Sequence, residues 1–160
     1  MDTEQSPSQI RLREYEKLDL QKQAQIIVEN LMLGPLQIAE NQFDVERLGI
    51  TAILSVLGFE QNKKFDGICN VERKWVCVED RVEDESQMGS ALVEAVEQIH
   101  DWICHQNRVV YVHCQSGISR SATVVIAYLM KHHNLPLMES YKLVFDVRPV
   151  CIIFACHITH

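Results

Sequence analysis

Apolar residues along this chain alternate between short continuous runs and longer stretches with helical spacing. The short runs are typical of buried strands and occur at 26–28, 31–33, 51–57, 75–78 and 109–112. The longer stretches predict helices over 36–48, 86–105, 119–132 and 136–147. Strands and helices alternating in this way predict an α/β fold with a mainly parallel central sheet of about five strands, flanked by helices on both faces.

The same pattern divides the chain into three segments. Residues 1–24 scatter a few apolar side chains among charges, which predicts an N-terminal arm or a short helix. Residues 25–149 contain every predicted strand and helix, and are long enough to bury a core as one domain. Residues 150–160 form an apolar tail after Arg148-Pro149.

Composition narrows the classes of protein that fit. The net charge of −7 disfavours broad nucleic-acid binding, so an anion site must rest on a few local groups. No apolar run approaches the ~20 residues of a membrane-spanning helix, and the first twenty residues do not resemble a secretory signal. We therefore expect no membrane partner and a cytoplasmic protein, with the nucleus as the alternative location.

The six cysteines show neither a disulfide framework nor metal-ligand spacing. A chain of this kind keeps its thiols reduced, and it contains no CxxC pair. The cluster at the very end is a weak zinc signal, made of Cys151, Cys156, His157 and His160. We expect no metal and no cofactor.

One segment carries the candidate chemistry. It reads His113-Cys114-Gln115-Ser116-Gly117-Ile118-Ser119-Arg120-Ser121 and lies between a predicted buried strand and a predicted helix. A short polar loop at such a junction forms an anion cradle, because its backbone N–H groups curl around one site and the helix N-terminus adds partial positive charge. The residues predicted to bind phosphate are Gln115, Ser116, Gly117, Ile118, Ser119 and Arg120.

Cys114 is the predicted nucleophile. A helix N-terminus and a nearby cation lower the pKa of a thiol, and the thiolate is the reactive form. Arg120 follows six residues later, where its guanidinium can hold two phosphate oxygens. Ser121 can donate a hydrogen bond to the thiolate, and His113 is predicted to orient the loop. The alternative is a structural role, because free cysteines are often small core residues; the strand, Gly117 and the following helix favour catalysis.

A general acid is also required, because the leaving oxygen needs a proton. Asp80 follows the strand 75–78, and a right-handed crossover would make that strand a parallel neighbour of 109–112. Asp80 and Cys114 would then lie at the same carboxyl edge of the sheet. Asp84 is the rival candidate. The nearby Glu79, Glu83 and Glu85 are interpreted as solvated or helix-capping residues.

At these residues the chain resembles the dual-specificity protein phosphatases, within the wider class of HCxxxxxR cysteine phosphatases. The matching segments are 113–123, 127–130, 31–34, 49–54 and Val78-Glu79-Asp80. Ser116 departs mildly from the alanine that the family commonly has. The resemblance covers about residues 25–149 and implies that this is the catalytic domain of a small, atypical member.

The resemblance also implies a mechanism. Cys114 would form a cysteinyl-phosphate, Asp80 would act as acid and then as base, and Arg120 would clamp the phosphate, with no metal. Phosphotyrosine and phosphoserine or phosphothreonine in phosphoproteins would be the substrates. Two alternatives stay open: a catalytically weak phosphate-binding or scaffold protein, and a phosphatase acting on a lipid, RNA or sugar phosphate.

Two further expectations concern the tail and the other cysteines. The family usually continues after Arg-Pro with a proline-asparagine turn and a helix, and residues 150–160 contain no such turn. Our hypothesis is an altered C-terminus that exposes apolar surface and lowers stability. An exposed thiolate oxidises readily, and Cys77 or Cys104 could then form a disulfide with Cys114, although a plain core position is the favoured interpretation of each.

Overall fold

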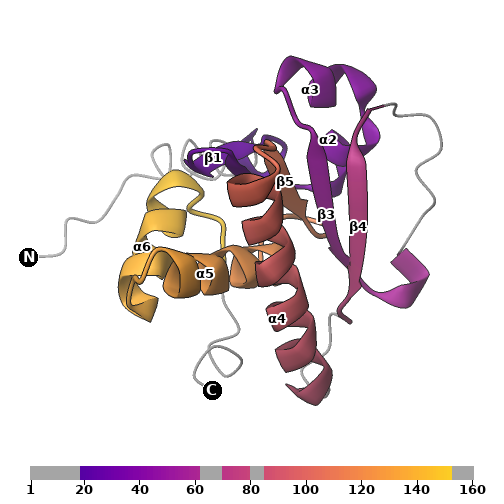
Figure 1. Cartoon of the computed structure of the whole chain (residues 1–160). Helices are drawn as coiled ribbons and strands as arrows, with labels where there is room; N and C mark the ends of the chain where they lie inside the picture. The colour runs from indigo at the N-terminus through magenta and orange to yellow at the C-terminus, as the bar shows by residue number, and fades with distance from the viewer. Residues whose placement is uncertain (1–18, 62–69, 80–84, 153–160) are drawn as a thin grey trace, which may run out of the picture.

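The computed structural model describes residues 19–61, 70–79 and 85–152 (Figure 1). Its five strands form one sheet in the order β1-β2-β5-β3-β4. Their bounds are Gln25–Val28 (β1), Leu31–Gly34 (β2), Ala52–Leu57 (β3), Glu72–Cys77 (β4) and Val110–His113 (β5). Only β1 runs antiparallel to its neighbour; β2, β5, β3 and β4 are parallel. The predicted mainly parallel sheet is confirmed.

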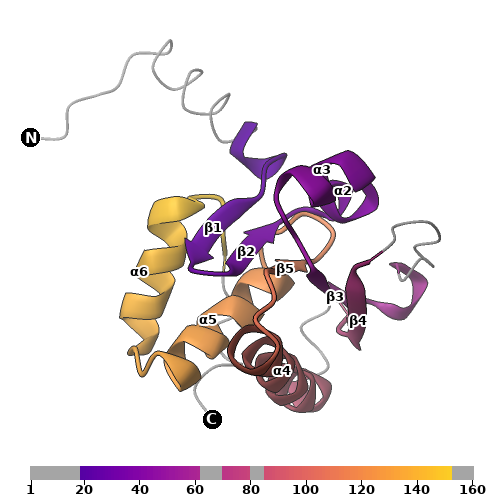
Figure 2. The ribbon, with the colours of Figure 1, turned by 45° about the horizontal axis from the view of Figure 1, so that its top comes forward.

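Helices cover both faces of this sheet, also as predicted (Figure 2). On one face lie α4 (Glu85–His100), α5 (Arg120–His132) and α6 (Leu137–Val147), and on the other lie α2 (Leu36–Glu40) and α3 (Gln42–Arg47). Each face of the sheet carries a hydrophobic core cluster, and the side chains of β5 alternate between the two. Val110 and Val112 belong to the larger cluster, and Tyr111 belongs to the smaller one under α2 and α3. Residues buried on both sides make these strands continuous apolar runs.

Helix α5 lies in the middle of its layer and is buried along most of its length. Nine of its thirteen residues are buried, including Arg120 and Ser121 at its start. This burial explains why its sequence is apolar on nearly every side. Because its first residues are buried too, the N-terminus of α5 is held in place at the end of the loop that follows β5.

Two predicted helices differ in detail from those observed. The stretch 36–48 is interrupted at Asn41, whose extended backbone ends α2 and whose side chain accepts a hydrogen bond from the N–H of Asp44 at 3.2 Å, capping α3. The stretch 86–105 contains α4 followed by a single π turn, η2 (Asp101–His105). Gly49 follows α3 with a φ of 66°, as a C-terminal glycine should.

The sequence-based prediction that strands β4 and β5 are neighbours is wrong. Strand β3 lies between them and pairs in parallel with both. A connection that passes over one strand is as compatible with right-handed crossover as one that does not. Because all three strands run the same way, the carboxyl ends of β4 and β5 still meet at one edge of the sheet.

The beginning of the C-terminal tail is part of the fold. The N–H of Ile152 donates to the carbonyl oxygen of Ile118 at 2.8 Å. Cys151 is only 2% exposed, with its sulfur 3.9 Å from the carbonyl oxygen of Gly117. The rest of the tail lies outside the described residues. No helix in the described part of the chain is long and apolar enough to cross a membrane.

These contacts predict that removing the tail destabilises the protein. A variant ending at Pro149 loses the Ile152 hydrogen bond and the buried Cys151 side chain, at a cost of about 1–3 kcal/mol. Its melting temperature, measured by circular dichroism, should fall by roughly 3–10 °C. Ile152→Ser is the matched control, because that side chain is exposed and the backbone bond remains. A truncated protein that melts at or above the temperature of the full chain would support the destabilising tail instead.

Candidate active site

The loop between β5 and α5 holds all of its carbonyl groups outward. Six consecutive carbonyl oxygens accept hydrogen bonds from donors around the loop: Cys114 from His113 Nδ1, Gln115 from Leu36 N, Ser116 and Gly117 from Arg148, Ile118 from Ile152 N, and Ser119 from Thr123 N and Oγ1. Because the N–H and C=O groups joined by one peptide bond point in opposite directions, the following amides turn toward the centre of the loop. Such a ring of amides is an anion site.

Gly117 lets the loop turn against the end of β2. Its φ is 63°, in the left-handed region that favours glycine. A Cβ atom at this position would lie 2.3 Å from the carbonyl oxygen of Gly34 and 2.9 Å from the nitrogen of Pro35. Both the backbone conformation and the space therefore exclude a side chain here.

Cys114 lies at the base of the loop and is 3% exposed. The hydroxyl of Ser121 donates to its sulfur at 3.2 Å. Burial raises the pKa of the Cys114 thiol, but hydrogen bonds from the Ser121 hydroxyl and N–H, the charge of Arg120 and the Ile118 N–H outweigh it, and the net pKa is lowered. The structure thus brings together Cys114, Arg120 and Ser121 as the sequence predicted.

His113 is a buried, neutral link between the loop and β3. Burial lowers its pKa to about 4, although the hydrogen bond to Cys114 O acts in the opposite direction. A carbonyl only accepts, so Nδ1 carries the proton and donates to Cys114 O at 2.9 Å. In the neutral ring Nε2 is then an acceptor, and it receives the hydroxyl of Ser55 at 2.7 Å. This placement suits the loop-orienting role predicted for His113.

Arg120 is held by two groups that lie before it in the chain. Its Nη1 donates to Gln61 Oε1 at 2.7 Å and to the carbonyl oxygen of Val78 at 3.0 Å, and the side chain is 2% exposed. Gln61 belongs to the 3₁₀ turn η1 (Phe59–Gln61) that follows β3. Gln61 was not among the residues predicted from the sequence; the signal available was a polar residue shortly after a buried strand, at the carboxyl edge of the sheet.

These groups line a pocket of about 260 Å³, formed by Gln61, Cys114, Gln115, Ser116, Ile118, Ser119 and Arg120. Five of the six predicted phosphate-binding residues line it, and Gly117 shapes the loop instead. Ligand pockets that enclose drug-sized molecules are usually larger, so this one suits a phosphate group while the rest of a substrate stays outside.

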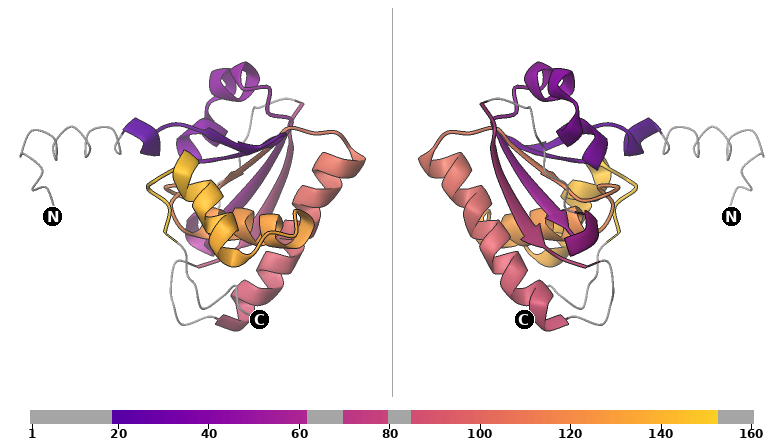
Figure 3. Two further views of the ribbon diagram at one scale, coloured as in Figure 1. Left: turned by 90° about the vertical axis from the view of Figure 1, so that its left-hand side faces the viewer. Right: turned by 90° about the vertical axis from the view of Figure 1, so that its right-hand side faces the viewer.

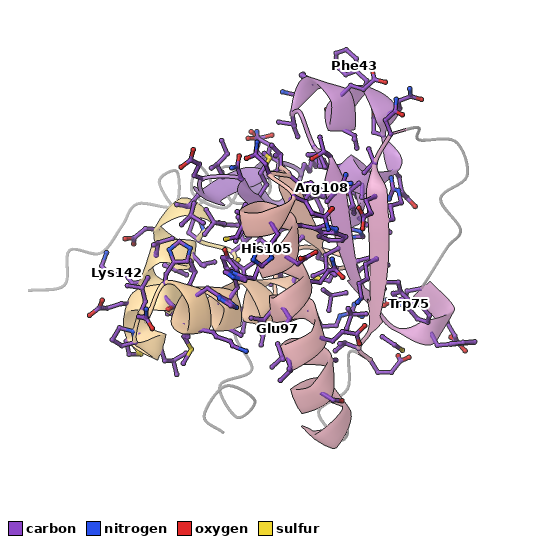
Figure 4. The ribbon with its side chains drawn as sticks, viewed as in Figure 1. Phe43, Trp75, Glu97, His105, Arg108 and Lys142 are labelled. Carbon is purple, nitrogen blue, oxygen red and sulfur yellow. The ribbon has the colours of Figure 1, made fainter. Side chains whose placement is uncertain are left out.

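The general-acid candidates Asp80 and Asp84 lie outside the described residues, as does Glu83. The residues just before them are at the carboxyl edge of the sheet. Val78 hydrogen-bonds both to Leu57 and to Arg120. The carboxylate of Glu79 accepts from the N–H of Phe59, the first residue of η1, at 2.8 Å. Figure 4 shows Trp75, a residue of β4, beside η1.

The two cysteines considered as disulfide partners are both exposed, and neither is a core residue. Cys104 lies in η2, and Figure 3 shows α4 running back alongside the sheet so that η2 reaches the end at which β5 begins. That end is opposite Cys114. Cys77 ends β4 at the same edge as Cys114, with β3 between them. Among the described residues, no group of His, Cys, Asp or Glu is arranged to hold a metal ion.

Comparison with known proteins identifies the family. The family model described as dual specificity phosphatase, catalytic domain, matches residues 31–157, well over half of the chain. The chain therefore belongs to the dual specificity phosphatase family, and the resemblance seen in the sequence is confirmed.

Individual relatives agree with this assignment. Dual specificity protein phosphatase 26 of Bos taurus is 33% identical over 120 residues, which are 75% of this chain and 57% of that protein. Protein 123R of Invertebrate iridescent virus 6 is 38% identical over 124 residues, 78% of this chain and 79% of that protein. The chain thus spans little more than half the length of the mammalian relative.

Solved structures show the same fold. Human DUSP28 has a TM-score of 0.70 at 24% identity, covering 82% of this chain and 84% of that one. The human tyrosine phosphatase-like serine/threonine/tyrosine-interacting protein has a TM-score of 0.74 at 24% identity, covering 86% and 91%. These neighbours confirm the α/β architecture predicted from the sequence.

The contacts of Gly117 predict that Gly117→Ala is strongly destabilising. The methyl group meets backbone atoms that cannot move aside, and φ stays unfavourable, so we expect a loss of about 2–4 kcal/mol in urea unfolding. Gly89→Ala in α4 is the matched control, because its Cβ meets nothing within 4 Å. That variant should gain about 0.5–1 kcal/mol. Equal stability of Gly117→Ala and the parent protein would contradict the described loop geometry.

Proposed function

We propose that this chain hydrolyses phosphotyrosine and phosphoserine or phosphothreonine in proteins through a cysteinyl-phosphate intermediate. The observation that carries the proposal is the environment of Cys114. Its sulfur lies below a ring of inward amides, with a hydroxyl donor at 3.2 Å and a lowered pKa. Thiolate, amide ring and Arg120 are the parts that phosphoryl transfer by cysteine needs.

In the first step the Cys114 thiolate attacks phosphorus, forming an S–P bond as the P–O bond to the substrate breaks. Asp80 gives its proton to the leaving oxygen, which departs as a neutral alcohol or phenol. The inward amides and Arg120 stabilise the charge on the three remaining phosphoryl oxygens. The hydrogen bonds from Arg120 to Gln61 and Val78 keep its guanidinium at the pocket.

In the second step a water molecule attacks phosphorus and gives a proton to the Asp80 carboxylate. The S–P bond breaks, inorganic phosphate forms, and Cys114 leaves as a thiolate. The Ser121 hydroxyl stabilises the departing sulfur through its hydrogen bond. No metal is required in either step, because protein groups supply both the nucleophile and the charge stabilisation.

The pocket lining favours phosphoproteins over polyanionic lipids or RNA. Among the described residues that line the pocket, Arg120 is the only cation, and the others are uncharged or the nucleophile itself. A ligand carrying several phosphates would need further lysine or arginine side chains around the pocket. A single phosphate on an otherwise solvent-facing side chain is the better match.

Replacing the nucleophile tests the chemistry directly. In buffer containing EDTA, the full chain should hydrolyse p-nitrophenyl phosphate, and Cys114→Ser should lose roughly 10⁴-fold or more in kcat/KM. Cys104→Ser, an exposed cysteine at the opposite end of the sheet, is the matched control and should keep full activity. Absence of turnover in the folded full chain would favour a phosphate-binding protein, to be checked by binding of phosphopeptides.

A second test separates the two acid candidates. Asp80→Asn should lower kcat about 10²–10⁴-fold on a phosphotyrosine peptide, whose leaving group needs a proton. It should remove the fall in rate at high pH, because that limb reflects deprotonation of the acid. The loss should be smaller on p-nitrophenyl phosphate, whose leaving group is stable as an anion. Asp84→Asn serves as the control; the reverse result would assign the acid to Asp84.

A further inference from the structure

Arg148 is a fully buried cation directly behind the phosphate-binding loop. It is the residue that caps the C-terminus of α6, and none of its surface is exposed. Burial lowers the pKa of its guanidinium, while the nearby thiols of Cys151 and Cys114 and the hydroxyl of Tyr111 raise it. Burying a charge is costly unless hydrogen bonds satisfy it.

The guanidinium is satisfied by six oxygen atoms on two sides. Toward the loop, Nε donates to Gly117 O at 2.7 Å and Nη2 donates to Ser116 O at 3.2 Å. Away from the loop, the acceptors belong to residues 20–25: Leu20 O at 2.7 Å, Gln23 O at 2.8 Å, Gln21 O at 3.2 Å and the side chain of Gln25. One side chain therefore ties the loop to a segment more than ninety residues earlier.

We propose that Arg148 is a positioning residue for catalysis, which fixes two peptide groups of the phosphate loop so that their amides face the reacting atoms. This inference rests on the proposed function and adds a residue outside the HCxxxxxR motif to it. Holding Ser116 O and Gly117 O outward turns the N–H groups of Gly117 and Ile118 inward. A freed peptide could rotate and present its carbonyl dipole to the phosphate.

The orientation of the Gly117–Ile118 peptide affects the pKa of the Cys114 thiol. The N–H of Ile118 is one of the hydrogen bonds that lower the pKa of the Cys114 thiol. The positive charge of Arg148 also favours the thiolate form of Cys114, because the thiolate and the guanidinium attract each other. Tyr111 and Cys151, whose pKa values are raised by burial, stay neutral near pH 7, as does His113. Among the described residues near the sulfur, Arg120 and Arg148 are therefore the charged groups.

A role in stability alone is the competing interpretation, since the same side chain also holds residues 20–25. A variant at Gln25 distinguishes the stability role from the positioning role. Gln25→Leu removes a hydrogen bond on the side of Arg148 away from the loop and leaves the bonds to Ser116 and Gly117 in place. It should lower the melting temperature without changing the reactivity of Cys114.

The test measures the rate of Cys114 alkylation by iodoacetamide from pH 5 to 9, following the Cys114 peptide by mass spectrometry in full-length variants. Arg148→Met keeps the length of the side chain and removes charge and donors. We expect its alkylation at pH 6 to slow roughly tenfold as the thiolate population falls. We also expect about tenfold weaker tungstate binding by calorimetry and a loss in kcat/KM of about 10–100-fold.

Arg148→Lys is the second variant and keeps the positive charge. An ammonium group cannot reproduce the pair of hydrogen bonds that the guanidinium donates to Ser116 O and Gly117 O. Its alkylation profile should lie between those of the parent and Arg148→Met, with tungstate affinity still reduced. If Arg148→Met fails to fold, the comparison of Arg148→Lys with Gln25→Leu decides the matter.

The proposal is overturned if a folded Arg148 variant keeps the parental alkylation profile and tungstate affinity, or if Gln25→Leu shifts both as far as the Arg148 variants do. Alkylation and tungstate binding need no turnover. A parent chain that lacks phosphatase activity but shows these Arg148-dependent shifts would therefore contradict the proposed function alone.

Discussion

The outward fixing of the carbonyl groups in loop 114–119 is the constraint on which the rest of the site depends. An amide ring is useful to an anion only if no carbonyl turns inward, and each peptide unit could otherwise rotate. Donor groups of five residues prevent this, and these residues come from β5, α2, α5, the end of α6 and the tail. The loop is therefore held by elements from most of the chain rather than by its own sequence.

This arrangement explains how an acidic protein can build an anion site. The chain carries a net charge of −7, yet the groups around Cys114 are amides, the start of α5 and two buried arginines. The neighbouring ionisable groups stay neutral: burial keeps His113 unprotonated, with a pKa of about 4, and raises the pKa of Cys151 to about 11. Burial thus leaves positive charge beside Cys114 on the two arginines, while the neighbouring His113 and Cys151 stay neutral.

The pocket also joins segments that are far apart in the sequence. Arg120 reaches Gln61 after β3 and Val78 after β4, so two strand ends are fixed relative to the phosphate loop. Val78 lies two residues before the proposed acid. The Arg120 side chain therefore connects the loop that carries Cys114 to the carboxyl end of β4, the strand that precedes the proposed acid.

The sequence by itself determined the elements and the local chemistry. Strong apolar periodicity predicted every strand and the α5 helix. The HCxxxxxR spacing placed Cys114, Arg120 and Ser121 at one junction between a strand and a helix, because they lie close together in the sequence. Strand order, the break at Asn41, and the roles of Gln61 and Arg148 came only from the tertiary structure. The break at Asn41 is a local cap, formed with the N–H of Asp44. The roles of Gln61 and Arg148 depend on contacts between residues 31 to 128 positions apart, and no local pattern encodes which distant donor meets which loop carbonyl.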